Sequence, residues 1–228
     1  MSGWTAPAPA DRTATPLPRW LVVAAACWLA ASWAISTGFM TPSTATRASV
    51  AHAVQSFTLM VAAGAVVAWP LARLSLRTPR SILRTVVLDV ITIVVLVHVT
   101  IFPLRAISGW SRDRLLLLDA SLMSAIAIAA SVLLIGLRTD RTVRRMLAGL
   151  AIVLLAAGPE APWIALGIQA PSVARALPGA LSVVWSLSDP SPGPVNAIMT
   201  SDTVATAIIA AAALVTALAW SRRTVTLA

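Results

Sequence analysis

The chain has 228 residues, of which 58% are hydrophobic and 11% are charged, and its mean hydropathy is +0.87. An ordinary globular chain carries about 25% charged residues, so this composition excludes a water-soluble fold and indicates a membrane protein. All 17 basic residues other than histidine are arginines, and the net charge is +9. Because these arginines cluster at the ends of apolar segments, they predict membrane topology and not nucleic-acid binding.

The N-terminal part of the chain predicts a tail followed by a first span. Residues 1–18 are rich in Pro, Ala and Thr and predict a disordered cytoplasmic tail. The apolar run over about 19–40 is too long for a secretory signal core, and predicts a retained transmembrane helix. Cys27 is the only cysteine, so no intrachain disulfide can form, and we interpret it as a small buried hydrophobe.

Five further apolar runs predict transmembrane helices, because each is long enough to cross a hydrocarbon core of about 30 Å at 1.5 Å per residue. The six predicted spans cover about 19–40, 52–73, 83–107, 114–137, 145–168 and 202–220. Pro70 lies where a kink or a helix end is expected, and Pro103 lies near the far end of the third span.

A basic connector, residues 73–84, separates the second and third predicted spans. It contains Arg73, Arg77, Pro79, Arg80 and Arg84. A connector of this kind cannot lie in lipid, and short basic loops stay on the cytoplasmic side. It is therefore the best candidate for a surface that contacts a cytoplasmic partner.

Residues 169–200 interrupt the pattern of long spans. They contain five prolines and an apolar patch, ALSVVWSL, at 180–187. Eight residues are too few to cross the membrane, so the segment 178–190 predicts a re-entrant or interfacial helix before the last span.

The distribution of arginines predicts the orientation. Six spans bring both termini to one side, where twelve arginines lie against five on the other side. The positive-inside rule therefore predicts a multi-pass protein of the cell inner (plasma) membrane with both termini in the cytoplasm. Residues 19–223 form the six-helix domain, and 224–228 form a short C-terminal tail.

Four ionisable residues within the predicted spans are functional candidates by default. They are Asp89, His98, Asp119 and Glu160. Asp89 follows Arg84 closely, which favours a structural ion pair near the interface, and His98 favours a histidine bonded to a neighbouring helix. Asp119 and Glu160 are expected near the outer interface. Asp89 and His98 are nine residues apart, so they face opposite sides of one helix and form no proton relay by themselves.

The sequence predicts no catalytic, cofactor or metal site. It contains no pair of histidines at ligand spacing, no phosphate-binding glycine loop, no nucleophile elbow and no paired-carboxylate signature. We therefore expect no catalysis by this chain alone.

The overall pattern resembles the membrane domain of type-2 (export-type) ATP-binding-cassette permeases. The resemblance combines six spans and cytoplasmic termini with the stretch LARLSLRTPRSILR at 71–84, the stretch SVLLIGLRTDRT at 131–142 and the segment 178–190. It covers about residues 52–220. In that family the segment after the second helix forms a coupling element on the ATPase.

The resemblance implies a membrane-spanning subunit of an ATP-driven exporter. Its expected partners are a separate cytoplasmic ATPase, a second permease in a homodimer or heterodimer, and membrane lipids. The ATPase would contact the residues of the connector, Arg73, Arg77, Pro79, Arg80 and Arg84. Two alternatives stay open: a structural or assembly subunit of a larger membrane complex, and an ion-coupled carrier or membrane enzyme that uses Asp89 or His98.

Overall fold

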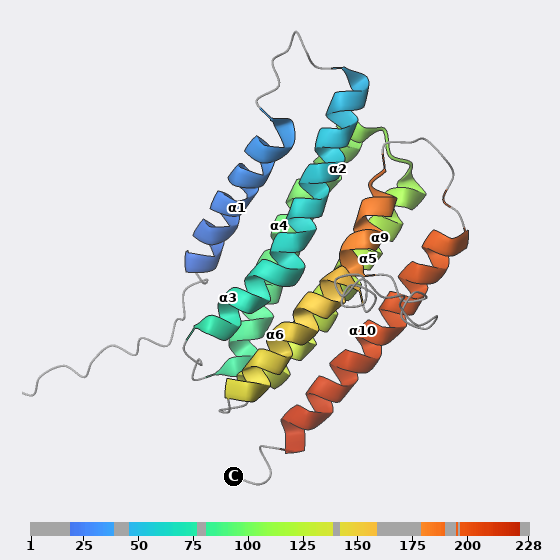
Figure 1. Ribbon diagram of the computed structural model, residues 1–228. Coiled ribbons are helices and arrows are strands. Elements are labelled where there is room, and N and C mark those ends of the chain that lie inside the picture. Colours follow the sequence, from blue (N-terminus) through green and yellow to red (C-terminus); the bar gives the residue numbers. More distant parts are fainter. Residues whose placement is uncertain are drawn as a thin grey trace, which may run out of the picture.

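The computed structural model shows an all-helical bundle (Figure 1). It describes residues 19–38, 46–76, 81–138, 142–158, 179–189, 195 and 197–223. The helices are α1 (Arg19–Thr37), α2 (Arg47–Ala63), the π-helix η1 (Gly64–Ala68), α3 (Trp69–Ser75), α4 (Ile82–Ser108), α5 (Arg112–Leu137), α6 (Thr142–Ala157), α9 (Ala180–Leu187) and α10 (Ala197–Arg223). The described residues contain no strand, and the predicted all-α class is confirmed.

Five helical segments are long and apolar enough to cross a membrane. They are Arg19–Thr37, Arg47–Ser75, Ile82–Ser108, Arg112–Leu137 and Met199–Ala217. These segments correspond to the first, second, third, fourth and sixth predicted spans. Their outward side chains are largely apolar, as expected for surfaces that face lipid.

The central element of the bundle is α5. It packs against α3, α4, α6, α9 and α10, and most of its side chains are buried. Its buried small residues, such as Ser124, Ala125 and Ala129, allow the neighbouring helices to approach closely. In contrast, α1 and α10 are peripheral and expose most of their residues.

The second span contains a π-helical turn where a helix end or kink was expected. Helices α2, η1 and α3 run on as one segment, and η1 ends directly before Trp69 and Pro70. The backbone N–H of Trp69 donates to the carbonyl of Gly64, five residues back. Proline has no N–H to offer, so this wider turn lets the helix continue through Pro70.

The fifth predicted span, 145–168, differs from the structure. Helix α6 ends at Ala157, and Gly158 follows with a φ of +88°, in the left-handed region that favours glycine. Sixteen residues of α6 reach only about 24 Å, short of the hydrocarbon core. The described residues therefore confirm five of the six predicted spans, and the part of the fifth predicted span beyond Gly158 lies outside the described residues.

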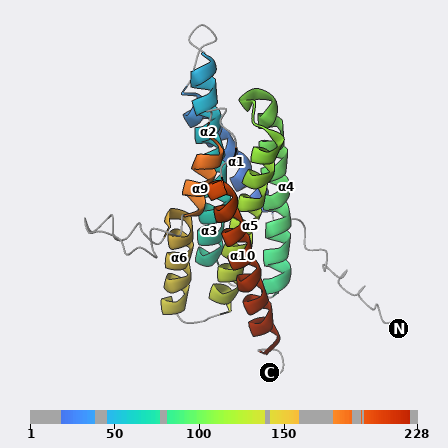
Figure 2. The same cartoon turned by 90° about the vertical axis from the view of Figure 1, so that its right-hand side faces the viewer.

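Helix α9 lies in line with α6, further along the same path through the bundle (Figures 1 and 2). Gly179, which precedes α9, lies so close to Ala157 and Gly158 that a Cβ there would overlap the backbone nitrogen of Gly158. Helix α9 also packs against α2, α5 and α10, and Val184 and Leu187 are buried. The expected re-entrant or interfacial helix is therefore an inner helix of the bundle that continues the path of α6.

Some predictions fall outside the described residues. These are the tails 1–18 and 224–228, the connector residues Arg77, Pro79 and Arg80, and Glu160. One further expectation is corrected: Cys27 is exposed on the outer side of α1, because α1 contacts the bundle along only one narrow face.

Candidate functional site

Asp89 lies in a buried cluster near the beginning of α4. Its side chain is fully buried, and Oδ2 lies 2.9 Å from Nε of Arg73, a residue of α3. The indole Nε1 of Trp69 donates to the same oxygen at 3.4 Å. The guanidinium of Arg73 also stacks on the ring of Trp20, 5.4 Å from the ring centroid, so the cluster joins α1, α3 and α4.

This cluster changes the expected roles of two connector arginines. Arg73 is 7% exposed and is directed at Asp89, so it is not available to a cytoplasmic partner in this structure. Arg84 is exposed at the start of α4, and the expected Arg84–Asp89 pair is replaced by the Arg73–Asp89 pair. Among the described connector residues, Arg84 is therefore the better candidate for a contact with a partner.

A second polar pair, His98 and Asp119, joins α4 to α5. Nε2 of His98 lies 3.3 Å from Oδ1 of Asp119, and Nδ1 lies 2.8 Å from the carbonyl oxygen of Val94. The imidazole also stacks on Phe102, with 5.5 Å between the ring centroids. Both ring nitrogens of His98 therefore face acceptors of the same chain, one on α4 and one on α5.

The short turn between α4 and α5 explains why these two side chains meet. Gly109, with a φ of +70°, ends α4, and the hydroxyl of Ser111 accepts a hydrogen bond from the N–H of Arg114 to begin α5. Residues at similar distances from the turn therefore lie side by side on the two antiparallel helices. The sequence shows two apolar spans joined by a short turn, and this pattern could have predicted that His98 and Asp119 lie side by side. The sequence analysis considered each residue separately and did not predict their contact.

Asp119 lies deeper than expected. It is seven residues into α5, about 10 Å along the helix from Arg112, and it contacts His98 instead of the arginines at the helix start. His98 contacts a neighbouring helix, in agreement with the sequence analysis. Asp89 is buried inside the bundle, whereas His98 is partly exposed on its outer side, as their spacing along α4 requires.

The sequence analysis did not predict a set of polar contacts near the C-terminal end of α9. Nη1 of Arg114 donates to the carbonyl oxygen of Asp189 at 2.6 Å, and the side-chain amide of Gln55 donates to the carbonyl oxygen of Trp185 at 3.0 Å. These contacts satisfy carbonyls at the end of α9 and hold it against α2 and α5.

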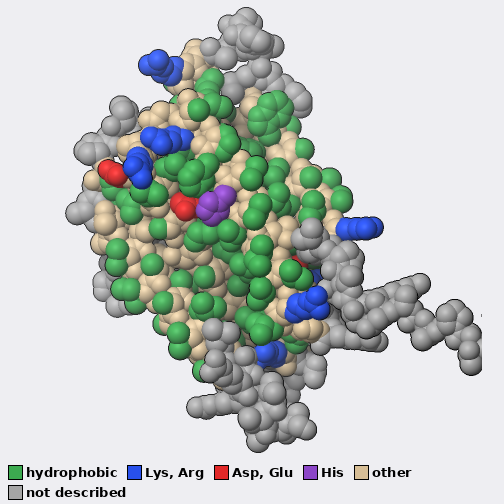
Figure 3. All heavy atoms as spheres, turned by 180° about the vertical axis from the view of Figure 1, so that it is seen from behind, with side chains coloured by type: hydrophobic (Ala, Val, Ile, Leu, Met, Phe, Trp, Pro, Cys, Tyr) green, Lys and Arg blue, Asp and Glu red, His purple; other side chains and the backbone are tan. Residues whose placement is uncertain are grey.

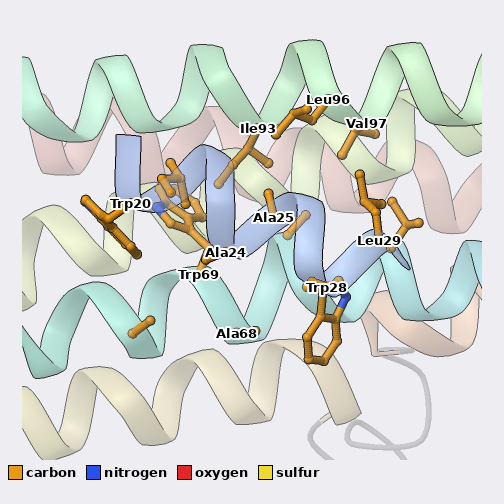
Figure 4. Close-up of a pocket in the computed structure, with 15 residues that line it drawn as sticks. Trp20, Ala24, Ala25, Trp28, Leu29, Ala68, Trp69, Ile93, Leu96 and Val97 are labelled. Carbon is orange, nitrogen blue, oxygen red and sulfur yellow. The ribbon is translucent and has the colours of Figure 1, made fainter. Parts of the chain in front are cut away.

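An apolar cavity of about 170 Å³ lies between α1, the α2–η1–α3 segment and α4 (Figure 4). Its lining includes Trp20, Trp28, Trp69, Ile93 and Val97. It is slightly larger than an engineered cavity of about 150 Å³ that holds benzene. The cavity can therefore accept a small apolar group or a short piece of a hydrocarbon chain.

The π-helical turn shapes one wall of this cavity. Nε1 of Trp28 donates to the carbonyl oxygen of Met60 at 2.9 Å. A Cβ at Gly64 would lie 2.5 Å from the same nitrogen, so only glycine leaves room for the indole. Gly64 and the contact of Trp28 with Met60 thus fix how closely α1 approaches α2.

The described residues contain no group of three or more His, Cys, Asp or Glu side chains that could hold a metal ion. Comparisons of the chain with protein families, curated proteins and solved structures found no match. The function is therefore argued from the bundle, its broken path through α6 and α9, its polar pairs and its apolar cavity.

Proposed function

We propose that this protein is the membrane-spanning subunit of an ATP-driven exporter and works with a separate ATPase. The observation that carries the proposal is the break between α6 and α9, two in-line helices of 16 and 8 residues inside the bundle. Together they are long enough to cross the hydrocarbon core, at about 36 Å.

A broken helix inside a membrane protein exposes polar backbone groups at both new ends. Such groups are tolerated at membrane depth only where protein covers them or where they line a water-filled path. Transport proteins use discontinuous helices in this way, because the free ends bind substrates or ions. The break directly precedes the last helix, α10, where the resemblance to export-type permeases also has its interrupted segment.

The other requirement of the proposal is a surface for the ATPase. The end of α3, the start of α4, the end of α5 and the start of α6 lie at one end of the bundle (Figure 1). Arg84 is exposed at this end. The residues that flank the α3–α4 connector and those that flank the α5–α6 connector thus lie at the same end of the bundle. This arrangement supports contact of both connectors with one soluble partner.

The test is a purification of the full-length protein from its native membrane in mild detergent. We expect an ATPase with a phosphate-binding glycine loop to co-purify in stoichiometric amounts. Arg84→Glu should reduce the recovered ATPase by about tenfold, because a like charge replaces an attractive one at the contact.

Arg105→Glu is the matched control, because Arg105 is also exposed on α4 but lies near its opposite end. It should leave the recovery of the ATPase unchanged. Co-purification of several integral membrane proteins without an ATPase would refute the exporter and would support an assembly subunit instead. An equal loss for both variants would show that Arg84 makes no specific contact.

A further inference from the structure

The apolar cavity between α1, the α2–η1–α3 segment and α4 is long and narrow. Its lining runs from Trp20 to Leu29 on α1 and from Val61 to Ala72 on the α2–η1–α3 segment. At 1.5 Å per residue these two stretches measure about 14 Å and about 17 Å. Spread over such a length, a volume of about 170 Å³ has room for one hydrocarbon chain, but not for a helix, which is about 10 Å across.

Small side chains leave this space open, and a tryptophan stands at either end of them. Ala24 and Ala25 line the cavity from α1, and Ala68 lines it from η1. Figure 4 shows Trp20 and Trp28 on either side of the two alanines of α1. Protein interiors are close-packed and contain few voids of this size. An open space beside alanines therefore points to an apolar group that comes from outside the chain.

The cavity opens sideways, toward the surroundings of the bundle. Helix α1 packs mainly against α2, so the cavity between α1 and α4 is only partly closed. Ala24 and Trp28 line the cavity and are nevertheless exposed, Trp28 to 40%. On the back of the bundle, where α4 lies, hydrophobic side chains cover most of the middle and arginine side chains gather toward the two ends (Figure 3). A surface that faces lipid has this pattern, so hydrocarbon chains of the bilayer lie beside the opening.

The length and the position of the cavity match one leaflet of a bilayer. Trp20 directly follows Arg19, the first residue of α1, so the cavity begins at one end of the first span. From there its length of about 14–17 Å corresponds to half of a hydrocarbon core about 30 Å thick. One acyl chain of a phospholipid has the same reach, because each leaflet supplies half of the core.

The end of the cavity at the start of α1 is positively charged. Arg19 is exposed there, and the guanidinium of Arg73 stacks on Trp20. Asp89 is the counter-charge of Arg73, and α1 and α3 contain no acidic residue, so a net positive charge is left. Basic pockets between membrane helices bind anionic headgroups, and a guanidinium matches the geometry of a phosphate.

We propose that this cavity binds one acyl chain of an anionic phospholipid and that Arg19 binds the phosphate of its headgroup. The chain lies along the alanines between Trp20 and Trp28, and the headgroup lies at the end where α1 begins. The lipid fills the space between α1 and α4, and it thereby adds a contact to a helix that otherwise packs along one narrow face. The proposal does not rest on the exporter, and it concerns a lipid that stays bound and not a transported substrate.

The first test is photo-cross-linking of the purified full-length protein in phosphatidylcholine vesicles. The vesicles contain a minor fraction of phosphatidylglycerol that carries a photoreactive acyl chain. Mass spectrometry of the digested protein should find the label on lining residues of α1 and α4, for example Ala25 and Leu96. Ala24→Phe should reduce this label by about fivefold or more, because the added ring occupies the same space as the chain.

Ala26→Phe is the matched control, because Ala26 is also exposed on α1 but does not line the cavity. It should leave the label unchanged. The same label in Ala24→Phe and the wild type would overturn the proposal. An equal loss in the two variants would overturn it too, because the labelled lipid would then reach α1 from its outer side and not within the cavity.

The second test asks whether the site selects the headgroup. The same photoreactive chain carried on phosphatidylcholine should label the cavity about fivefold less, because an arginine near the membrane surface attracts an anionic lipid. Arg19→Gln should remove this difference between the two probes. Arg47→Gln should keep it, since Arg47 is exposed at the start of α2, at the other end of the bundle. Equal labelling of the wild type by both probes would overturn the proposal, because the cavity would then take any hydrocarbon chain.

Discussion

At the scale of single residues, the burial of Asp89 is the most demanding feature of this chain. A carboxylate that is removed from water needs a cation and hydrogen-bond donors close by. Asp89 obtains both on one oxygen, from the guanidinium of Arg73 and the indole of Trp69. The ion pair is thus a link between α3 and α4, and Trp20 extends that link to α1.

Asp89→Asn should destabilise the protein by about 3–5 kcal/mol, because it leaves the buried guanidinium of Arg73 without a counter-charge. The double variant Arg73→Met with Asp89→Leu removes both charges and should recover much of this loss. The protein is heated in mild detergent and then passed over a size-exclusion column. The measured quantity is the temperature at which half of the protein no longer elutes as a single species. A double variant that is no more stable than Asp89→Asn would contradict the assignment of Arg73 as the counter-charge.

The sequence predicted that Asp89 is paired but identified the wrong partner. Arg84 lies five residues away on the same helix, and proximity along the chain favoured it. The actual partner depends on which face of α4 meets α3, a property of helix packing that spacing alone does not determine. The same limit hid the His98–Asp119 pair, although the two residues were each recognised as candidates.

At the scale of helices, the junction of α6 and α9 depends on two glycines. Gly158 ends α6 in a left-handed conformation, and Gly179 allows the start of α9 to approach the end of α6. The backbone of Gly179 itself is ordinary, with a φ of −68°. Glycine is therefore needed at position 179 because there is no room for a side chain, and not because of its backbone conformation.

Gly179→Ala should destabilise the protein by about 1–3 kcal/mol, as overpacking does, because its methyl group would meet backbone atoms that cannot rotate away. Gly149→Ala is the matched control within α6. A Cβ there would lie 3.5 Å from Leu71, an ordinary contact, and alanine favours the helix by about 0.5–1 kcal/mol. The same heating assay in detergent should separate the two variants. Equal melting of Gly179→Ala and the wild type would mean that the two helices do not meet as closely as the structure shows.

Hydropathy predicted the five long spans because a hydrocarbon core requires about twenty apolar residues in each. It did not predict the path through α6 and α9, since the two parts are separated by twenty residues of sequence between Gly158 and Gly179. Hydropathy instead predicted one span over 145–168, which includes most of α6, and treated the apolar patch at 180–187 as too short to cross the membrane. Only the contact between Gly179 and the end of α6 reveals that they lie in line.

At the scale of the whole molecule, the bundle has one end at which six helix termini meet. The starts of α1, α4 and α6 and the ends of α3, α5 and α10 lie there (Figure 1). Eight described arginines belong to helix termini at this end, and four belong to termini at the other end: Arg19, Arg73, Arg84, Arg138, Arg144, Arg145, Arg222 and Arg223 against Arg47, Arg105, Arg112 and Arg114. The described arginines and the full count therefore both predict that the end at the start of α1 and the end of α10 is the cytoplasmic one.

Accessibility labelling measures this orientation directly. In a Cys27→Ser background, Ala48→Cys and Ser81→Cys introduce single thiols at exposed positions, at the start of α2 and just before α4. A membrane-impermeant maleimide added to intact spheroplasts should label Ala48→Cys and should reach Ser81→Cys only after lysis, because the basic connector stays inside. The reverse pattern would place the connector outside and would remove the surface that a cytoplasmic ATPase needs. Labelling of both thiols before lysis would mean that the chain inserts in two orientations, which the positive-inside rule does not allow for an excess of arginines this large.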